Sequence, residues 1–218
     1  ITMDNKCLKI NEIYSTLIGE GDYAGLPCVI VRLSGCNLRC SYCDTKHAYD
    51  NGIEMTVGQV MRAVNKFRIA PVLITGGEPL LQSQVIELME SLIEQDNIVL
   101  LETNGSLPVK DVQGEVLTIM DIKCPSSGES EKNLYENIDF LTERDDIKFV
   151  LADREDYDWA LGVIDEEGLE GYCHILMSPV YGKLNPRDLA QWMIDDGLIA
   201  RMSLQLHKII WDPDERGR

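Results

Sequence analysis

Three of the seven cysteines lie close together, in the stretch of residues 35–45. Cys36, Cys40 and Cys43 have the spacing C-x3-C-x2-C. Thiolates this close indicate a shared metal centre, because packing alone cannot satisfy their lone pairs. A structural zinc ion takes four protein ligands, whereas three leave one position open for chemistry. A cluster of four irons held by three cysteines likewise leaves one iron open to a substrate or cofactor. The spacing therefore predicts a reactive metal centre.

The composition of the chain excludes several kinds of binding partner. The chain has 218 residues and a formal net charge of −17, which argues against binding to nucleic acid or to an anionic membrane surface. We find no apolar stretch of the roughly 20 residues that span a bilayer, and no secretory signal at the N-terminus. An odd number of cysteines, three of them clustered, does not resemble a disulfide framework. We expect a cytoplasmic protein with no membrane and no nucleic acid partner.

Apolar runs alternate with amphipathic stretches along the chain. This pattern is typical of a parallel sheet built from βαβ units, and about six or seven such strands are too few for a full eightfold barrel. We expect one domain over residues 1–218. The predicted strands cover residues 7–14, 28–33, 72–75, 98–101, 116–120, 147–151, 173–177 and 201–206. The predicted helices cover 57–68, 85–92, 133–142 and 155–166, and a last one starts at Asn185-Pro186.

Polar motifs follow the predicted strands. In parallel α/β folds, ligands bind at the carboxyl ends of the strands, and the cysteine stretch follows its own strand in the same way. Two glycines at a strand end allow the backbone to approach a ligand closely, although they also fit a simple tight turn. The sequence therefore predicts one binding face at these strand ends. The motifs are Thr75-Gly76-Gly77-Glu78-Pro79, Glu102-Thr103-Asn104-Gly105, Asp121-Ile122-Lys123, Ser178-Pro179 and His207.

Several polar residues allow either a functional or a structural interpretation. Arg32 lies inside an apolar strand and could bind a carboxylate bidentately, or it could reach solvent. Glu20, between two glycines, is expected in an exposed turn, where it accepts from a ligand or is merely solvated. His207 is a donor or acceptor for a ligand, or an interior histidine. Some residues are expected to have no chemical role: His174 in the core, buried or neutral thiols at Cys7, Cys28, Cys124 and Cys173, and solvated Glu155, Asp156, Asp158, Asp165 and Glu166.

The cysteine spacing, with an aromatic residue just before the third cysteine, resembles that of the radical S-adenosylmethionine enzymes. Gly76-Gly77-Glu78-Pro79 matches the second hallmark of that superfamily. The resemblance implies that Cys36, Cys40 and Cys43 ligate a [4Fe–4S] cluster whose open iron is chelated by S-adenosylmethionine. Reduction then cleaves the cofactor to a 5′-deoxyadenosyl radical, so the protein itself needs no catalytic side chain.

Further motifs resemble those of the 7-carboxy-7-deazaguanine synthase family. They are Leu17-Ile18-Gly19-Glu20-Gly21, Arg32, Cys43-Asp44-Thr45-Lys46-His47 and Gln205-Leu206-His207-Lys208. This implies a shortened, incomplete (β/α) barrel of the radical S-adenosylmethionine type with a mostly parallel sheet, usually as a homodimer. The implied reaction contracts the ring of 6-carboxy-5,6,7,8-tetrahydropterin to 7-carboxy-7-deazaguanine with loss of ammonia, on the route to queuosine. An electron donor such as flavodoxin or ferredoxin is also implied.

The resemblance also implies roles for individual residues. Thr45 would ligate Mg²⁺ through a hard oxygen. The family commonly has glutamine where this chain has Ile18, so a side-chain hydrogen bond to the pterin is missing there. The implied pterin contacts are Leu17, Ile18, Gly19, Glu20, Arg32, Thr75 and His207. The implied S-adenosylmethionine contacts are Tyr42, Cys43, Asp44, Gly77, Asp121, Ile122, Lys123, Ser178, Pro179, Val180 and Tyr181.

Two other interpretations of the cysteine stretch remain open. A glycyl-radical activating enzyme shares the cysteine spacing and the small size, but does not require Gly19-Glu20-Gly21, Arg32 and His207. A non-catalytic zinc-binding module would use the three cysteines together with His47 as a closed four-ligand site. That module leaves the strand-end motifs unexplained.

Overall fold

The computed structural model describes residues 7–69, 71–213 and 215–217. In this part of the chain, nine strands form a single sheet. They are β1 (Leu8–Leu17), β2 (Pro27–Leu33), β3 (Ile53–Met55), β4 (Pro71–Gly76), β5 (Ile98–Thr103), β6 (Leu117–Ile122), β7 (Asp146–Leu151), β8 (His174–Pro179) and β9 (Arg201–Met202). The α-helices are α1 (Val57–Val64), α2 (Gln84–Ile93), α3 (Arg154–Glu166), α4 (Pro186–Asp195) and α5 (Leu206–Ile210). Short 3-10 helices cover Lys46–Ala48, Pro79–Leu81, Pro125–Ser127, Ser130–Lys132 and Tyr135–Phe140. The expected single domain also includes residues 1–6, which lie outside the described residues.

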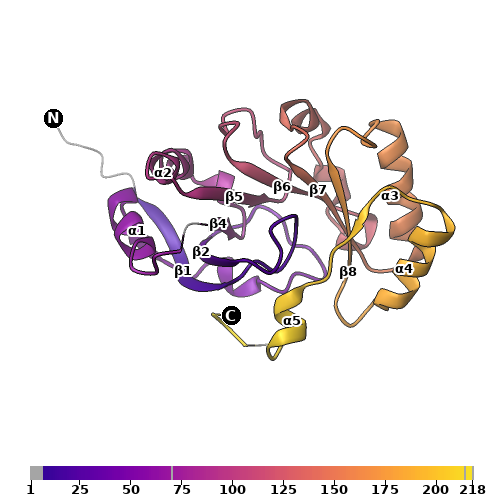
Figure 1. The fold of residues 1–218 in the computed structure, drawn as a ribbon, viewed down its shortest axis with the longest axis horizontal. Helices are drawn as coiled ribbons and strands as arrows, with labels where there is room; N and C mark the ends of the chain where they lie inside the picture. The colour runs from indigo at the N-terminus through magenta and orange to yellow at the C-terminus, as the bar shows by residue number, and fades with distance from the viewer. Residues whose placement is uncertain (1–6, 70, 214, 218) are drawn as a thin grey trace.

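The sheet is open and mostly parallel. Its strand order is β3-β1-β2-β4-β5-β6-β7-β8-β9, with β1 antiparallel to both β2 and β3 and every other neighbouring pair parallel. The two edge strands, β3 and β9, are not paired with each other, so the barrel does not close. Figure 1 shows α1 and α2 beside the first half of the sheet, and α3 and α4 beside the second half. The predicted incomplete barrel is confirmed.

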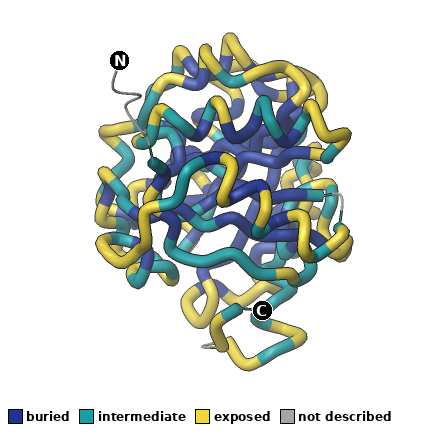
Figure 2. The backbone as a smooth tube through the Cα atoms, turned by 90° about the vertical axis from the view of Figure 1, so that its left-hand side faces the viewer, coloured by how far each residue is buried: buried dark blue, intermediate teal, exposed yellow. Residues whose placement is uncertain are grey.

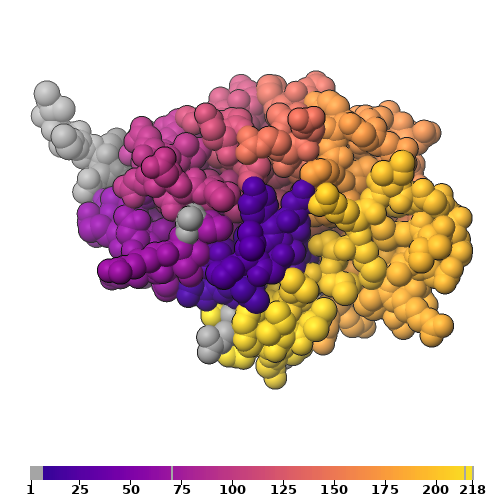
Figure 3. Space-filling view, viewed as in Figure 1, coloured from indigo at the N-terminus to yellow at the C-terminus, as the bar shows by residue number. Residues whose placement is uncertain are grey.

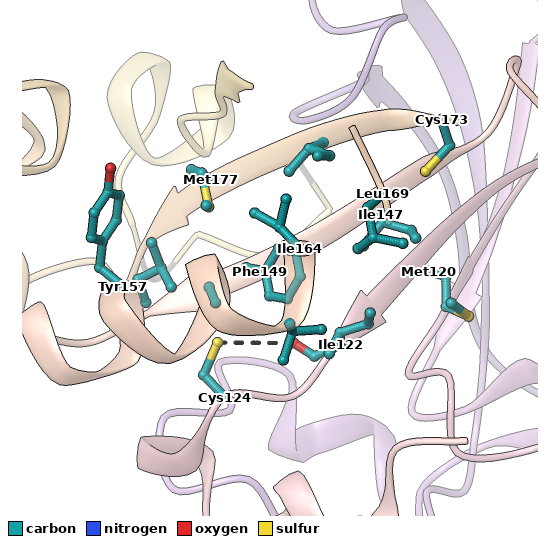
Figure 4. Close-up of a cluster of buried hydrophobic side chains, with 14 of the residues drawn as sticks. Met120, Ile122, Cys124, Ile147, Phe149, Tyr157, Ile164, Leu169, Cys173 and Met177 are labelled. Carbon is teal, nitrogen blue, oxygen red and sulfur yellow. Dashed lines mark hydrogen bonds between the residues drawn. The ribbon is translucent and has the colours of Figure 1, made fainter. Parts of the chain in front are cut away.

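Alternate residues of each strand pack outward against these helices. Val29, Val31 and Leu33 of β2 join the buried residues of α1 and α2 in one apolar cluster. A second cluster joins β6, β7 and β8 to α3 and α4, and Figure 4 shows Phe149, Ile164 and other members of it. In Figure 2 the backbone at the centre of the molecule is buried, while the surrounding loops and the outer turns of the helices are exposed.

The predicted helix starts are confirmed by their caps. Thr56 Oγ1 accepts a hydrogen bond from the Gln59 N–H, and the Gln59 side chain accepts one from the Thr56 N–H. This reciprocal pair satisfies two of the N–H groups that a helix start leaves open. Asn185 caps α4 in front of Pro186, which needs no N–H partner at the first helical position. No helix in the described residues has the length and apolar character needed to cross a bilayer.

The inner face of the sheet changes from apolar to polar along the strands. Near the amino ends, Ile30, Leu73 and Leu100 pack in a third apolar cluster. Toward the carboxyl ends, the same face carries the polar side chains of Arg32, Thr75, Glu102, Asp121, Lys148 and Ser178. Since residues two apart on a strand share a face, Arg32, Thr75 and Glu102 stand directly above Ile30, Leu73 and Leu100, whereas Lys148 stands above Asp146. The barrel therefore has an apolar lower part and a polar upper part.

The β1–β2 connection, residues 18–26, closes the amino edge of the barrel, and we call it the floor loop. Leu17 pairs with Pro27, which places the loop at the amino end of β2 and hence of its parallel neighbours. Ile18 is buried in the inner apolar cluster, and its backbone exchanges hydrogen bonds with Gly25 and Leu26. An apolar residue at position 18 is thus explained as the lowest layer of the inner core.

Several expected elements differ from the observed ones. The predicted helix over 133–142 is only a 3-10 segment, Tyr135–Phe140, and the predicted strand over 201–206 is reduced to β9. The chain turns after β9 because Leu206 begins α5, a helix that the sequence did not indicate. The strand β3 was also not predicted. The fragments that were wrongly assigned are short and lie at the margins of the sheet, where contacts with the rest of the chain decide local structure.

Two predictions about the burial of polar residues, His174 and Asp156, were wrong. His174 is not a core residue: its side chain is 35% exposed and pairs with Asp22 and Asp146. Asp156 is not solvated but buried, where its two oxygens accept hydrogen bonds from the Ser126 and Ala152 N–H groups. The thiols of Cys28, Cys124 and Cys173 are buried as expected, and burial raises the pKa of each.

Candidate active site

A cavity of about 940 Å³ opens at the carboxyl ends of the parallel strands. Its volume lies in the range of small-molecule sites. It is lined by the floor loop, the cysteine loop after β2, the strand ends and α5. Of the residues predicted for a site, it brings together Leu17, Gly19, Glu20, Arg32, Cys36, Cys40, Tyr42, Cys43, Asp44, Thr45, Thr75, Gly77, Asp121, Lys123, Val180, Tyr181 and His207.

Four predicted residues do not line this cavity. Ile18 lies below it in the inner core, and Ile122 points outward into the cluster beneath α3, as Figure 4 shows. Ser178 and Pro179 are buried at the end of β8, although the Ser178 hydroxyl reaches Glu20. Only backbone atoms of Ile122 could therefore face a ligand.

The cysteine loop is held in place by hydrogen bonds from its backbone to other loops. The Gly35 N–H donates to the Ala48 carbonyl at 2.8 Å, and the Ser41 N–H donates to the Ser127 carbonyl at 2.9 Å. The Tyr42 hydroxyl donates to the Val150 carbonyl at 3.2 Å. These contacts fix the loop between the ends of β2, β6 and β7, so the direction of its thiols is set before any metal binds.

The two glycines after β4 support the cysteine loop from behind. A Cβ at Gly76 would lie 2.2 Å from the Leu33 carbonyl oxygen, and one at Gly77 would lie 2.1 Å from that of Gly35. Only glycine therefore allows the two backbones to touch, and the Glu78 N–H donates to the Gly35 carbonyl at 2.8 Å. The glycine pair is more than a tight turn, because the cysteine loop rests on it.

Glu78 braces the ends of β4 and β5. Its buried carboxylate accepts hydrogen bonds from the Asn104 N–H at 2.7 Å, the Thr103 hydroxyl at 2.9 Å and the Leu80 N–H at 3.0 Å. Burial raises its pKa in spite of these donors. The sequence showed Glu78 only as part of a strand-end motif, and the structure assigns it a structural role beside the cavity.

The donor set of the cysteine loop fits a cluster better than a single ion. In the described part of the chain, the sulfurs of Cys36, Cys40 and Cys43 do not all lie within 4.8 Å of one another. Around one zinc ion, bonds of about 2.3 Å would place sulfurs about 3.8 Å apart. Burial raises the pKa of Cys36 and of Cys40, so both are protonated until a metal binds. Three cysteines also suit a cluster of four irons, because they leave one iron open to a cofactor.

Glu20 occupies a buried position, not the exposed turn that the flanking glycines suggested. Its residue is 9% exposed, and its Oε2 lies 2.8 Å from Lys148 Nζ. The Ser178 hydroxyl donates to its Oε1 at 3.3 Å. Burial by itself lowers the pKa of Lys148, but the carboxylates of Glu20, Glu102 and Asp121 outweigh it and raise that pKa. Glu20 thus enters the cavity from below, already paired.

Lys148 is a cavity residue that sequence reasoning missed. It lies in β7 between Ile147 and Phe149, whose side chains pack outward. Because strand residues alternate between faces, a lysine between two buried apolar residues must face the inside of the barrel. A single lysine inside an otherwise apolar strand was the available signal.

Asp121 and Lys123 form a second buried pair at the end of β6. Lys123 Nζ lies 2.8 Å from Asp121 Oδ2. Asp121 Oδ1 is buried and accepts no hydrogen bond from any described residue, although Asp121 lines the cavity. A buried acceptor without a donor is costly, so this oxygen is suited to a ligand hydroxyl or ammonium group. A polar ligand at the end of β6 would supply the missing hydrogen bond.

Arg32 lies on the inner wall, and its side chain is only 15% exposed. Its Nε donates to Glu12 Oε1 at 2.7 Å, and its Nη2 donates to the Tyr14 hydroxyl at 3.0 Å. A guanidinium has five N–H groups, so donors remain for a ligand. Beside it, the Thr75 hydroxyl donates to Glu102 Oε2 at 2.9 Å. Glu12 and Tyr14 were not among the predicted site residues, and Glu102 was predicted only as part of a strand-end motif.

Helix α5 joins the cysteine loop to the floor loop. Lys208 Nζ lies 2.6 Å from Asp44 Oδ2, and the Leu206 N–H donates to the Gly19 carbonyl at 3.2 Å. Burial by itself raises the pKa of Asp44, but Lys208 outweighs it and lowers that pKa far below its usual range. Burial lowers the pKa of His207, which keeps this cavity residue neutral near pH 7. Figure 3 shows the C-terminal segment, in yellow, beside N-terminal residues, in indigo.

Comparison with known proteins first defines the class. The profile of the radical SAM superfamily matches residues 30–120, which include the cysteine loop and the glycine pair. The fold is similar to that of QueE from Escherichia coli, with a TM-score of 0.77 and 20% sequence identity over 94% of this chain and 99% of that one. The superfamily implies a [4Fe–4S] cluster and S-adenosylmethionine, which the donor set described above fits.

Two curated relatives narrow the class. The 7-carboxy-7-deazaguanine synthase of Chlorobaculum tepidum is 47% identical over 96% of this chain and 97% of the relative. The enzyme of the same name from Koribacter versatilis is 41% identical over 96% of this chain and 100% of the relative. The chain belongs to the 7-carboxy-7-deazaguanine synthase family. The similarity extends over nearly all of both chains, which favours this family over an activating enzyme or a zinc module.

Proposed function

We propose that this enzyme contracts the ring of 6-carboxy-5,6,7,8-tetrahydropterin to 7-carboxy-7-deazaguanine with loss of ammonia, in the biosynthesis of queuosine and related 7-deazapurines. One observation carries the proposal. A loop of three cysteines and a wall of paired polar side chains line the same cavity, in a chain that matches synthases of this name over almost their whole length. The pocket therefore has room for a reactive centre and a polar bicyclic substrate together.

The cofactor half of the cavity would be formed by the cysteine loop and the neighbouring strand ends. Cys36, Cys40 and Cys43 would hold the [4Fe–4S] cluster, and S-adenosylmethionine bound there supplies a 5′-deoxyadenosyl radical. Asp121 Oδ1 is the buried acceptor available to the cofactor. The remaining contacts proposed for the cofactor are Tyr42, Asp44, Gly77, the backbone of Ile122, Lys123, and Ser178 to Tyr181.

The substrate half would be formed by the inner wall and the floor loop. Arg32 keeps N–H groups for the pterin carboxylate after its bonds to Glu12 and Tyr14. Glu20, held by Lys148, faces the cavity with a carboxylate suited to the amino-pyrimidine edge. Other proposed contacts are Leu17, Gly19, Thr75 and His207, with Ile18 supporting the loop from the core.

Further components are proposed on family resemblance. Thr45 would ligate Mg²⁺, and in this structure its hydroxyl donates to Asp44 Oδ1 at 2.9 Å, at the edge of the cavity. A low-potential flavodoxin or ferredoxin would deliver the electron. The active species would be a homodimer of single-domain chains in the reducing cytoplasm, where a cluster held by thiolates is preserved.

An anaerobic assay tests the proposed reaction. Protein reconstituted with iron and sulfide should be brown, with broad absorbance near 400 nm. With dithionite, S-adenosylmethionine, Mg²⁺ and the carboxytetrahydropterin, mass spectrometry should detect 7-carboxy-7-deazaguanine and one ammonia per product. A Cys40→Ala variant serves as the control without activity.

Two results would contradict the proposal in different ways. Reductive cleavage of S-adenosylmethionine without product would retain the superfamily chemistry and reject this substrate. Colourless protein with stoichiometric zinc and no cofactor cleavage would reject radical chemistry altogether.

A further inference from the structure

Three potential metal ligands cluster at the opposite edge of the sheet from the cysteine loop. Asp22, Asp146 and His174 each offer one ligand atom, and these atoms all lie within 4.8 Å of one another. Among the described residues, no other group of three or more His, Cys, Asp or Glu side chains is placed this closely. The proposed reaction uses none of the three.

The fold itself brings these side chains together. Asp146 and His174 are the first residues of β7 and β8 and are paired in register, so both face the interior side by side. Asp22 comes from the floor loop, just after Gly21. Gly21 has φ +77°, and a Cβ there would lie 2.8 Å from Asp146 Oδ2. The left-handed backbone at this position favours glycine, and the floor loop lies directly against Asp146 there.

Two atoms of the cluster are buried without hydrogen bonds. The described residues contain four such side-chain atoms: Thr16 Oγ1, Asp121 Oδ1, Asp146 Oδ1 and His174 Nδ1. The first two residues line the active-site cavity, where a ligand is expected. The other two atoms face each other at 3.4 Å, and Asp146 is only 4% exposed. Their only polar contacts among the described residues are ion pairs inside the cluster, at 2.8 Å between His174 Nδ1 and Asp22 Oδ2 and at 3.4 Å between His174 Nδ1 and Asp146 Oδ1. Buried polar atoms normally have well-aligned partners, and a metal ion in place of the shared proton would provide them.

We propose that Asp22, Asp146 and His174 bind a divalent transition-metal ion, and that this ion is Zn²⁺. His174 Nδ1 lies 2.8 Å from Asp22 Oδ2 and 3.4 Å from Asp146 Oδ1. Tetrahedral zinc with bonds of about 2.0–2.1 Å places its ligands about 3.3 Å apart, so the two separations bracket the required value. One imidazole and two carboxylates suit zinc, and a water would complete the site.

Neighbouring groups already orient the two carboxylates. Arg201 pairs with the other oxygen of Asp22, Oδ1, and the Asp22 N–H donates to Asp146 Oδ2 at 3.4 Å. Such contacts around metal ligands fix the direction of the lone pairs. The bound ion would fasten the floor loop to β7 and β8, only two residues from Glu20. Its effect on the protein would therefore be to stabilise the floor of the cavity.

Metal binding is testable without the enzymatic reaction. The protein is first loaded with its iron–sulfur cluster, so that the thiols of the cysteine loop are occupied. It is then incubated anaerobically with Zn²⁺, desalted and assayed for zinc by mass spectrometry. We expect about one zinc per chain in the wild type and less than a fifth of that in His174→Gln and Asp22→Asn. These two side chains are partly exposed, so the variants should fold. Asp158→Asn, an exposed carboxylate outside the cluster, serves as the matched control and should retain the zinc.

Thermal unfolding provides a second readout. Added Zn²⁺ should raise the unfolding temperature of the wild type and of Asp158→Asn, but not that of His174→Gln or Asp22→Asn, because an ion that binds only the folded state stabilises it. Equal zinc contents in the wild type, His174→Gln and Asp22→Asn would overturn the proposal. So would an absence of stoichiometric zinc in the wild type, which would leave the cluster as an ion-pair network.

Discussion

Three pairs of oppositely charged side chains stand at the wall of the cavity. Arg32 is bonded to Glu12, Glu20 to Lys148 and Lys123 to Asp121. Isolated charges would be costly to bury, and each pair removes most of that cost while fixing its groups in one orientation. A substrate that binds here therefore meets donors and acceptors that are already positioned.

Replacing Arg32 should separate substrate binding from cluster assembly. In Arg32→Ala we expect affinity for the carboxytetrahydropterin to fall by about 2–5 kcal/mol, because a carboxylate in a largely buried site loses its charged partner. Iron content should stay at the wild-type level, since Arg32 does not contact the cysteine loop. Calorimetric titration with substrate, alongside an iron assay, measures both. An unchanged dissociation constant would remove Arg32 from the substrate site.

Replacing Lys148 should reveal how Glu20 is held. Lys148→Met leaves the Glu20 carboxylate buried without its cation, and we expect a loss of about 3–5 kcal/mol in the free energy of unfolding. The double variant Glu20→Gln/Lys148→Met should recover most of that loss, because it buries no charge. Chemical denaturation of the three proteins measures the effect. If the double variant is as unstable as Lys148→Met, the loss of stability does not come from breaking the Glu20–Lys148 ion pair.

Most of the residues predicted for a site line the cavity, but sequence reasoning misjudged the environment of some. The cysteines and the glycine pair were found because their spacing and position carry chemical information by themselves. Glu20 and His174 were misplaced because burial depends on contacts with residues more than a hundred positions away, such as Lys148 for Glu20. No local pattern encodes such contacts.

At the scale of elements, the cysteine loop is a rigid unit supported by the backbone of the glycine pair. Gly77→Ala would place a Cβ 2.1 Å from the Gly35 carbonyl oxygen. A backbone atom cannot move aside without moving the loop, so we expect a loss of about 1–3 kcal/mol in the free energy of unfolding and iron loading reduced by more than half. Iron analysis and thermal unfolding test this.

Gly162 offers a matched control for that substitution. It lies inside α3, and a Cβ there would meet nothing within 4 Å. Gly162→Ala should therefore gain about 0.5–1 kcal/mol through helix propensity and load iron normally. If both alanine variants loaded iron equally well, the cysteine loop would not depend on the glycine pair.

Helix α5 should respond to pH through Asp44. Because Lys208 lowers the pKa of Asp44, the pair stabilises α5 above the ordinary aspartate pKa of about 3.9, and this stability is lost only as pH falls through the lower folded value. In Lys208→Met, the pKa of Asp44 should rise, because the ammonium group no longer outweighs the effect of burial. Hydrogen exchange of residues 206–210 should be faster in the variant at pH 7.

Salt provides a control for that prediction. The Asp44 side chain is 45% exposed, so the contact with Lys208 is screened by solvent and ions. High salt should accelerate exchange in the wild type and have little effect on Lys208→Met. A wild-type helix that exchanges at the variant's rate under all conditions would mean that Lys208 does not hold it.

Long periodic elements were predicted well and short ones poorly. Thr56, Asn185 and the apolar strands carry local signals in their caps and alternation, which the structure confirms. The helix α5 has only five residues, and β9 has two. Segments this short have little stability of their own, so tertiary contacts such as Leu206 with Gly19 decide their conformation.

For the molecule as a whole, the open barrel leaves its cavity bordered by the C-terminal tail. Pro213, Glu215, Arg216 and Gly217 are among the lining residues. Removing residues 211–218 should raise the KM for substrate severalfold while leaving the unfolding temperature nearly unchanged, because the tail covers the cavity but lies outside the apolar clusters. Steady-state kinetics beside calorimetry measure this. An unchanged KM would show that the tail does not contribute to binding.

The contact between α5 and the cysteine loop affects when, during synthesis of the chain, the iron–sulfur cluster can be inserted. All three cysteines of the loop have been synthesised by residue 43, but Lys208, which pairs with the adjoining Asp44, follows 164 positions after Asp44. At translation rates of about 5–20 residues per second, this interval lasts about 8–30 s. During this interval the nascent chain carries three thiols without the Lys208–Asp44 contact, so we expect cluster insertion to be completed only after Lys208 has been synthesised and has paired with Asp44.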